Sequence, residues 1–293
     1  MKEPLPSSPA LPHSRAIGLT ALAMTAFAAN SLLCRQALRQ TSIDEASFTL
    51  IRILSGAITL ALIVRLRHGR FEVGGNWRSA TALFAYAACF SFAYRNLTVA
   101  TGALLLFFAV QSTMIGYGLW AGERMLPVQF AGLTLAAGGL IGLLLPGLTA
   151  PPMTAAILML LAGGSWGVYS LRGKAAADPT RITAGNFMRA TLFAAVLSLV
   201  QGSLTSFDAV GVVYAVASGA VASGLGYAIW YTALRGLKAT EAATVQLSVP
   251  VLAAAGGVLW LREPVTARLV LASLAILGGV ASVILAGRRP LRR

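Results

Sequence analysis

Ten stretches of mostly apolar residues follow one another along the chain, separated by short polar segments. A helix needs about 20 apolar residues to cross the hydrocarbon core of a bilayer, and each stretch meets or approaches that length. The ten predicted helices cover residues 16–34, 46–64, 77–94, 98–121, 127–145, 153–171, 182–201, 209–234, 239–261 and 266–286. The pattern predicts an all-α integral membrane protein with no inserted soluble domain.

Both ends of the chain are predicted to lie outside the helices. Residues 1–15 are rich in Pro and Ser and predict a disordered tail, whereas residues 287–293 form a basic tail. An alternative is that Ala26-Phe27-Ala28 is a signal-peptidase site, which would leave nine helices. We favour an uncleaved first helix because the apolar stretch continues to Cys34 and because an internal repeat, described below, includes that helix.

Composition supports the membrane assignment. Hydrophobic residues make up 57% of the chain and charged residues 11%, whereas soluble proteins carry about 25% charged residues. Soluble enzymes, nucleic-acid-binding domains and disordered chains are therefore excluded. With the N-terminus in the cytoplasm, the inner segments carry 16 Lys and Arg residues and the outer segments 5. By the positive-inside rule, this bias explains the net charge of +14 without a nucleic-acid partner and predicts that both termini are cytoplasmic.

The chain repeats itself at an offset of 140 residues. The segments that recur are 93–97, 119–123 and 138–139, matched by 233–237, 259–263 and 278–279. We therefore predict two five-helix units, residues 16–145 and 153–286. Because five is odd, the second unit enters the membrane in the opposite direction. Inverted repeats around a site at the membrane midplane are typical of secondary transporters.

Several motifs carry a resemblance to a known family. Gly122-Glu123 and Arg262-Glu263-Pro264 each follow a predicted helix and precede a Gly-Gly pair, and Trp166 and Pro250 also fit. The chain resembles the drug/metabolite transporter superfamily, specifically its ten-helix EamA-type exporters with two tandem units, and within these the bacterial aromatic amino-acid exporters. It departs from them in Phe27, where such proteins often have Trp, and in lacking a proline in the fourth helix equivalent to Pro250.

The resemblance implies a multi-pass protein of the bacterial inner membrane, with a central cavity lined by helices 1, 3, 4, 6, 8 and 9. Those same predicted helices carry the polar and aromatic residues that lie within apolar spans. The predicted cavity residues are Asn30, Tyr86, Phe90, Phe107, Gln111, Trp166, Tyr169, Tyr227, Trp230, Gln246 and Ser248. Pro250 is the predicted helix hinge. Trp77, Trp120 and Trp260 lie near helix ends, as in an interfacial aromatic belt.

Charged residues inside the membrane are few. All nine acidic residues lie in tails, loops or helix ends, so facilitated diffusion or exchange is favoured over proton antiport through a buried carboxylate. Glu123 and Glu263 are assigned structural roles at helix ends. Arg52 and Arg189 are the only charges well inside apolar spans; each could bind a substrate carboxylate or phosphate, but we favour structural roles.

No cofactor or metal is expected, because the chain has neither a P-loop motif nor metal-ligand spacing, and its two cysteines form no disulfide framework. The predicted function is export of small neutral or zwitterionic metabolites, most of all amino acids with large apolar or aromatic side chains. Alternatives are a nucleotide-sugar or sugar-phosphate exchanger, a drug exporter and, more distantly, a membrane-embedded enzyme. The small-residue faces Gly138-x-x-x-Gly142 and Gly278-x-x-x-Ser282 are predicted to pack on the chain's own core, which slightly favours a monomer over a dimer.

Overall fold

The computed structural model describes residues 13–69, 74–122, 124–147, 150–173, 178–202, 208–234, 237 and 239–286, and every regular element in these ranges is a helix. The helices are α1 (His13–Gln40), α2 (Glu45–His68), α3 (Trp77–Tyr94), α4 (Val99–Trp120), α5 (Pro127–Leu144), α6 (Met153–Gly173), α7 (Pro179–Val200), α8 (Ala209–Val216), η2 (Ala217–Leu225), α9 (Gly226–Leu234), α10 (Ala239–Gln246), α11 (Ser248–Leu259) and α12 (Ala267–Ala286). Residues 1–12 of the predicted tail 1–15, and the predicted tail 287–293, lie outside the described ranges, whereas residues 13–15 already belong to α1 and correct the predicted tail boundary.

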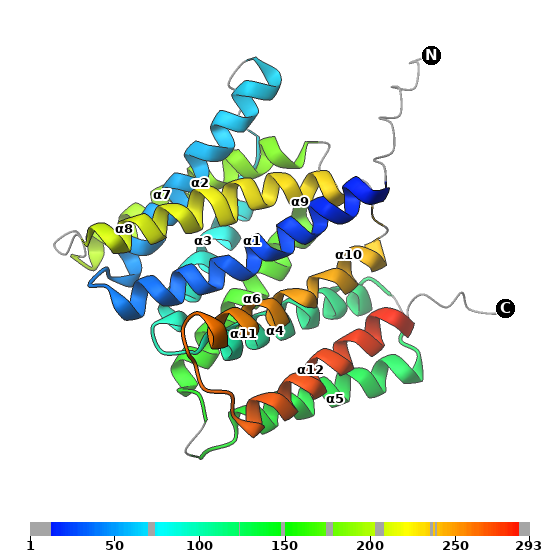
Figure 1. Ribbon diagram of the computed structural model, residues 1–293. Coiled ribbons are helices and arrows are strands. Elements are labelled where there is room, and N and C mark those ends of the chain that lie inside the picture. Colours follow the sequence, from blue (N-terminus) through cyan, green and yellow to red (C-terminus); the bar gives the residue numbers. More distant parts are fainter. Residues whose placement is uncertain are drawn as a thin grey trace, which may run out of the picture.

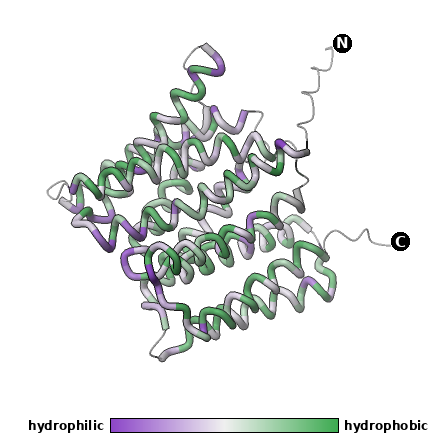
Figure 2. The backbone as a smooth tube through the Cα atoms, in the orientation of Figure 1, coloured by the Kyte–Doolittle hydropathy of each residue, from purple (hydrophilic) through white to green (hydrophobic). Residues whose placement is uncertain are grey.

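These helices form ten rods, because α8, η2 and α9 run end to end and α10 and α11 are separated by one residue (Figure 1). Eight rods are long and apolar enough to cross a membrane by themselves. Hydrophobic residues follow the rods and hydrophilic residues gather at their ends and connections (Figure 2). The all-helical membrane fold predicted from the sequence is confirmed.

The rods pair in the manner expected of two related halves. α5 packs on α12 and α2 packs on α7, each helix facing its own counterpart. The contacts that α6 makes with α3 and α4 of the first half correspond to the contacts that α1 makes with η2–α9 and α11 of the second half. α1 and α6 are therefore equivalent central helices, while α5 and α12 form an outer pair at the bottom of Figure 1.

α1 begins and α12 ends at the same side of the bundle, at the right of Figure 1. We call this side the inner end, since the distribution of basic residues predicts that it faces the cytoplasm. The opposite side is the outer end. It holds the end of α3, the start of α4 and the end of α11, and there α1 continues to Gln40, well beyond its predicted limit at residue 34.

Two irregularities interrupt the long rods. In η2 the backbone is π-helical, and a Cβ on Gly219 would collide with the Arg52 carbonyl oxygen of α2, so only glycine permits this approach. Between α10 and α11 the helix breaks at Leu247, three residues before Pro250. Proline removes one helical hydrogen bond, and its ring clashes with the carbonyl four residues earlier. That carbonyl belongs to Gln246, and the helix breaks at the next residue, Leu247.

Asp208 joins the α1–α2 connection to the start of α8. Its carboxylate accepts hydrogen bonds from the backbone N–H groups of Ser42 (3.0 Å), Gly211 (3.3 Å) and Val210 (2.8 Å). These bonds, the one from Ser42 foremost, hold the pKa of Asp208 below its usual range. The stability that this contact adds is therefore fully present when the pH lies above the ordinary aspartate pKa. It is lost as the pH falls through the lowered pKa of Asp208.

The α5–α12 interface uses different glycines from those predicted. A Cβ on Gly279 would collide with the Gly132 carbonyl oxygen, and a Cβ on Gly139 would lie 2.8 Å from the Ala275 Cβ. By contrast, Gly138, Gly142 and Gly278 have no neighbouring atom within 4 Å of an added Cβ. The prediction that these three pack on the chain's own core is wrong. In each Gly-Gly pair the second glycine makes the close contact, and the first faces outward.

We expect Gly279→Leu to separate α12 from α5, because the new side chain meets backbone atoms that cannot move aside. Overpacking of this kind costs about 1–3 kcal/mol or more. Gly278→Leu adds the same atoms one residue earlier, on the open face, and should leave folding unchanged. The yield of monodisperse protein on size-exclusion chromatography in detergent measures the difference. Equal yields for the two variants would contradict this assignment of the interface.

Candidate functional site

A central cavity of about 450 Å³ is lined by residues of α1, α3, α4, α6, η2, α9 and α10 and by Pro179, the first residue of α7. This volume lies within the range of about 300–1,000 Å³ typical of small-molecule pockets. Nine of the eleven predicted cavity residues line it, namely Asn30, Tyr86, Phe90, Phe107, Gln111, Trp166, Tyr227, Trp230 and Gln246. Phe27, Ser31, Met114, Ser223 and Tyr231 also line it and were not among the predicted set.

The remaining two predicted residues lie elsewhere. Tyr169 belongs to a neighbouring polar pocket rather than to the cavity wall. Ser248 is half-buried at the start of α11, where its hydroxyl donates to the Val245 carbonyl at 2.6 Å. Ser248 thus satisfies a backbone group exposed by the helix break and does not contact the cavity.

Aromatic rings form one wall of the cavity. The Trp166 ring lies 5.2 Å from the Tyr227 ring, nearly parallel at 18°, and 5.0 Å from the Tyr86 ring. The Phe27 ring lies 5.6 Å from the Tyr227 ring. Phe27 is thus part of the aromatic wall. Because the rings come from α1, α3, α6 and α9, the wall spans both halves of the chain.

Hydrogen-bonding groups lie beside this wall. Asn30 donates from Nδ2 to the Tyr86 hydroxyl (3.3 Å) and accepts at Oδ1 from the Ser218 hydroxyl (2.7 Å). Arg52 donates from Nη2 to the same Tyr86 hydroxyl at 3.0 Å. Gln111 and Gln246 add side-chain amides to the lining. Within the described residues, the lining contains no Asp, Glu, His, Lys or Arg.

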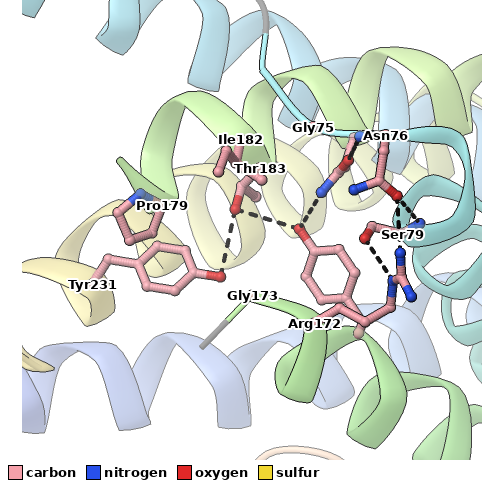
Figure 3. Close-up of a pocket in the computed structure, with 11 residues that line it drawn as sticks. Gly75, Asn76, Ser79, Arg172, Gly173, Pro179, Ile182, Thr183 and Tyr231 are labelled. Carbon is pink, nitrogen blue, oxygen red and sulfur yellow. Dashed lines mark hydrogen bonds between the residues drawn. The ribbon is translucent and has the colours of Figure 1, made fainter. Parts of the chain in front are cut away.

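A smaller polar pocket of about 280 Å³ adjoins the cavity at the inner end (Figure 3). Arg172 donates to the Ser79 hydroxyl (3.1 Å) and to Asn76 Oδ1 (3.3 Å). Tyr169 and Tyr231 approach the Thr183 hydroxyl, at 3.3 and 3.4 Å. Gly173, Pro179 and Tyr231 line both spaces. We call this pocket the vestibule, since it shares lining residues with the cavity and lies at the inner end.

A buried ion pair connects several elements at the outer end of the bundle. Arg35 Nε lies 3.2 Å from Glu263 Oε1, and Arg35 Nη1 donates to the carbonyl oxygens of Tyr94 and Arg95 at 2.8 and 2.7 Å. Glu263 Oε2 accepts from the backbone N–H of Val99 at 2.7 Å. The pair therefore joins α1, the α3–α4 connection and the segment after α11. It explains why α1 stays helical beyond its apolar stretch.

The two intramembrane arginines differ in their surroundings. Arg189 Nη1 donates to the Gly74 and Gly185 carbonyl oxygens at 2.7 and 2.9 Å, as expected of a structural role. Arg52 is 2% exposed and lies directly behind Tyr86 and Phe90 of the cavity wall. Sequence reasoning gave both the same role because they occupy equivalent places in the repeat.

Other candidate features lie away from the cavity. Trp77, Trp120 and Trp260 are 53%, 83% and 52% exposed on the outer surface, which suits an interfacial belt. The described residues contain no group of three or more His, Cys, Asp or Glu side chains that could hold a metal ion. Glu123, predicted as the counterpart of Glu263, lies outside the described residues.

Comparison with known proteins is consistent with this arrangement. Residues 153–285 match the EamA-like transporter family. An uncharacterized protein of Pseudomonas aeruginosa is 54% identical over 275 residues, which cover 94% of this chain and 96% of that protein. A crystal structure with 19% sequence identity superposes with a TM-score of 0.68, covering 95% of this chain and all of the other. At that identity the superposition shows a shared fold.

Proposed function

We infer that the chain is a multi-pass membrane transporter of the drug/metabolite transporter superfamily, because residues 153–285 match the EamA-like transporter family. We propose that it exports small zwitterionic metabolites with large apolar bodies, amino acids such as phenylalanine above all, across the bacterial inner membrane. The observation that carries this proposal is the lining of the central cavity, which combines stacked aromatic rings with a few amides and hydroxyls.

The cavity chemistry suits such a cargo. Trp166, Tyr227 and Phe107 offer broad apolar faces, and aromatic side chains stack on one another with a gain of about 0.5–1.5 kcal/mol beyond area burial. Asn30, Gln111 and Gln246 offer hydrogen bonds to a polar head group. An apolar pocket discriminates a single methylene by only about 1–3 kcal/mol, so we expect several large neutral amino acids to share the site.

The geometry also supports loading from the cytoplasm. The lining extends from Asn30 and Tyr86, in the middle of their helices, to Gly173 and Leu234 at the inner end. The Arg35–Glu263 ion pair connects several elements at the opposite end. Export then requires that the two repeats rock about the cavity, so that the vestibule closes and this ion pair opens. Such rocking of inverted repeats is the general basis of alternating access.

The other substrate classes fit the lining less well. Nucleotide sugars and sugar phosphates carry phosphates, which are best bound by several Arg or Lys groups, and Arg172 lies at the vestibule and not in the cavity wall. A cationic drug calls for a carboxylate, and none lies among the described lining residues. The same feature favours facilitated diffusion or exchange over proton coupling through a cavity carboxylate.

Competition for uptake tests the substrate class. Purified protein is placed in liposomes, and the initial rate of labelled phenylalanine uptake is measured with excess unlabelled competitors. We expect tryptophan, tyrosine, methionine and leucine to inhibit uptake, and sugar phosphates and nucleotide sugars to leave it unchanged. Liposomes without protein provide the background rate. Inhibition by sugar phosphates or nucleotide sugars, with none by large neutral amino acids, would refute the proposed substrate class.

A further inference from the structure

Arg52 is a buried cation that has no carboxylate partner among the side chains that the structure describes. Its side chain lies within the α2 membrane span and is 2% exposed. The carboxylates whose side chains the structure describes are all engaged elsewhere, in helix caps or ion pairs: Asp44, Glu45, Asp178, Asp208 and Glu263. A charge inside the membrane is costly, and such residues usually mark substrate or ion pathways. A negative group that balances Arg52 is therefore expected from another source.

The contacts of Arg52 point toward the cavity. Its Nη2 donates to the Tyr86 hydroxyl at 3.0 Å, and its guanidinium carbon lies 4.7 Å from the centre of the Phe90 ring. Tyr86 and Phe90 both line the cavity. The Nη1 group of Arg52 makes no hydrogen bond within the described residues. The Arg52 side chain thus contacts two side chains that line the cavity.

The Tyr86 hydroxyl is left with one hydrogen to donate. A tyrosine hydroxyl carries two acceptor lone pairs and one donor hydrogen. The guanidinium of Arg52 can only donate, and the Asn30 amide donates to the same oxygen at 3.3 Å. The Ser218 hydroxyl, at 2.7 Å from Asn30 Oδ1, holds that amide in this orientation. Both lone pairs are therefore used, and the Tyr86 hydrogen is free for an acceptor in the cavity.

We propose that the Tyr86 hydroxyl, with the charge of Arg52 behind it, binds the carboxylate of the transported molecule. This inference rests on the proposed function and assigns the part of the substrate that the site recognises. A carboxylate oxygen hydrogen-bonded to Tyr86 at about 2.7 Å lies within about 6 Å of Arg52 Nη2. Because burial lowers the local dielectric constant, attraction at this separation is much stronger than in water.

The other end of a zwitterionic head group meets a different environment. Its ammonium has no acidic partner among the described lining residues, although the faces of Trp166 and Tyr227 can attract a cation. The carboxylate should therefore be required for binding, whereas the ammonium should be dispensable. Aromatic monocarboxylates that lack an amino group are thus included in the substrate range, and aromatic amines are excluded.

Four compounds with the same phenyl ring separate these contributions. They are phenylalanine, 3-phenylpropionate, which has only the carboxylate, 2-phenylethylamine, which has only the ammonium, and phenylalanine methyl ester, in which the carboxylate is blocked. Binding to the purified full-length protein is measured by titration of tryptophan fluorescence, and uptake by competition in liposomes. We expect the two carboxylates to bind at least about tenfold more tightly than the amine and the ester, as for hydrogen bonds to charged groups.

Variants connect this ranking to the residues. Tyr86→Phe keeps the ring and removes the donor, so it should weaken phenylalanine binding about tenfold or more and abolish the preference for carboxylates. Arg52→Gln should also weaken phenylalanine binding and abolish the preference for carboxylates. Arg52→Lys keeps a positive charge and should retain part of both. Arg189→Gln is the matched control, because Arg189 occupies the equivalent place in the repeat but bonds to backbone carbonyls. This control should keep the wild-type ranking. If Arg52→Gln does not fold, the result for Tyr86→Phe alone tests the proposed carboxylate site.

The two assays separate failure of this inference from failure of the proposed function. Uptake of phenylalanine that the ester and the amine inhibit as well as the carboxylates do would overturn the carboxylate site and leave the transport proposal intact. Preferential binding of carboxylates without any uptake would support the site and contradict the proposed substrate. An unchanged ranking in Tyr86→Phe, or no binding of any of the four compounds, would overturn the inference.

Discussion

Trp166→Ala is expected to reduce phenylalanine uptake about tenfold or more while the protein stays folded. Trp166 is half-buried on the cavity side of α6, and its ring stacks on Tyr227 at 5.2 Å and on Tyr169 at 5.5 Å. Loss of a large aromatic anchor from a binding site costs about 2 kcal/mol or more. The initial rate in liposomes measures the defect, normalised to the amount of monodisperse protein.

Two further variants make this result specific. Gln246→Ala removes an amide from the same cavity and should also slow uptake. Trp77→Ala removes an equally large ring that is 53% exposed and contacts Phe193 outside the cavity, so it should leave uptake unchanged. If Trp166→Ala lowers the amount of folded protein, and the surviving molecules transport normally, the ring is a packing residue.

Glu263→Ala is expected to destabilise the protein by about 3–5 kcal/mol, because it leaves the buried Arg35 guanidinium without its counter-ion. The side chains of Arg35 and Glu263 are only 3% and 11% exposed. The change also removes the acceptor for the Val99 N–H at the start of α4. The apparent midpoint of thermal unfolding in detergent measures the loss.

An exposed ion pair at the same end of the bundle provides the control. Arg95 Nε lies 3.3 Å from Glu45 Oε1, but the Arg95 side chain is 49% exposed. Surface pairs contribute up to about 1 kcal/mol, so Glu45→Ala should lower the unfolding midpoint much less than Glu263→Ala. Similar shifts for the two variants would show that the Arg35–Glu263 contact does not hold the outer end together.

Local and periodic features could be predicted from the sequence. The apolar stretches place the ten rods because each must cover the width of a bilayer, and the repeat anticipates how they pair. Tyr86 and Phe90 are four residues apart, which brings them to one face of a helix. Their position in the cavity wall therefore follows once α3 is known to be central.

Contacts between distant segments could not be predicted in the same way. Arg52 and Arg189 are equivalent in the repeat, yet only Arg52 meets a hydroxyl on the cavity wall, and this depends on how α2 and α3 pack. In the pair Gly138-Gly139 either glycine can face a neighbouring helix, since adjacent residues lie about 100° apart on a helix. The packing of α12 determines that Gly139 is the one in contact.

Counterflow gives the most direct test of a single cavity that opens alternately to the two sides. Liposomes containing the purified protein are loaded with unlabelled phenylalanine and diluted into labelled phenylalanine, with no proton or sodium gradient. We expect the label to accumulate transiently inside above its external concentration, because unlabelled molecules leaving the liposome return the cavity to its outside-facing state. No overshoot with folded protein, or entry of label only when a proton gradient is imposed, would contradict alternating access without ion coupling.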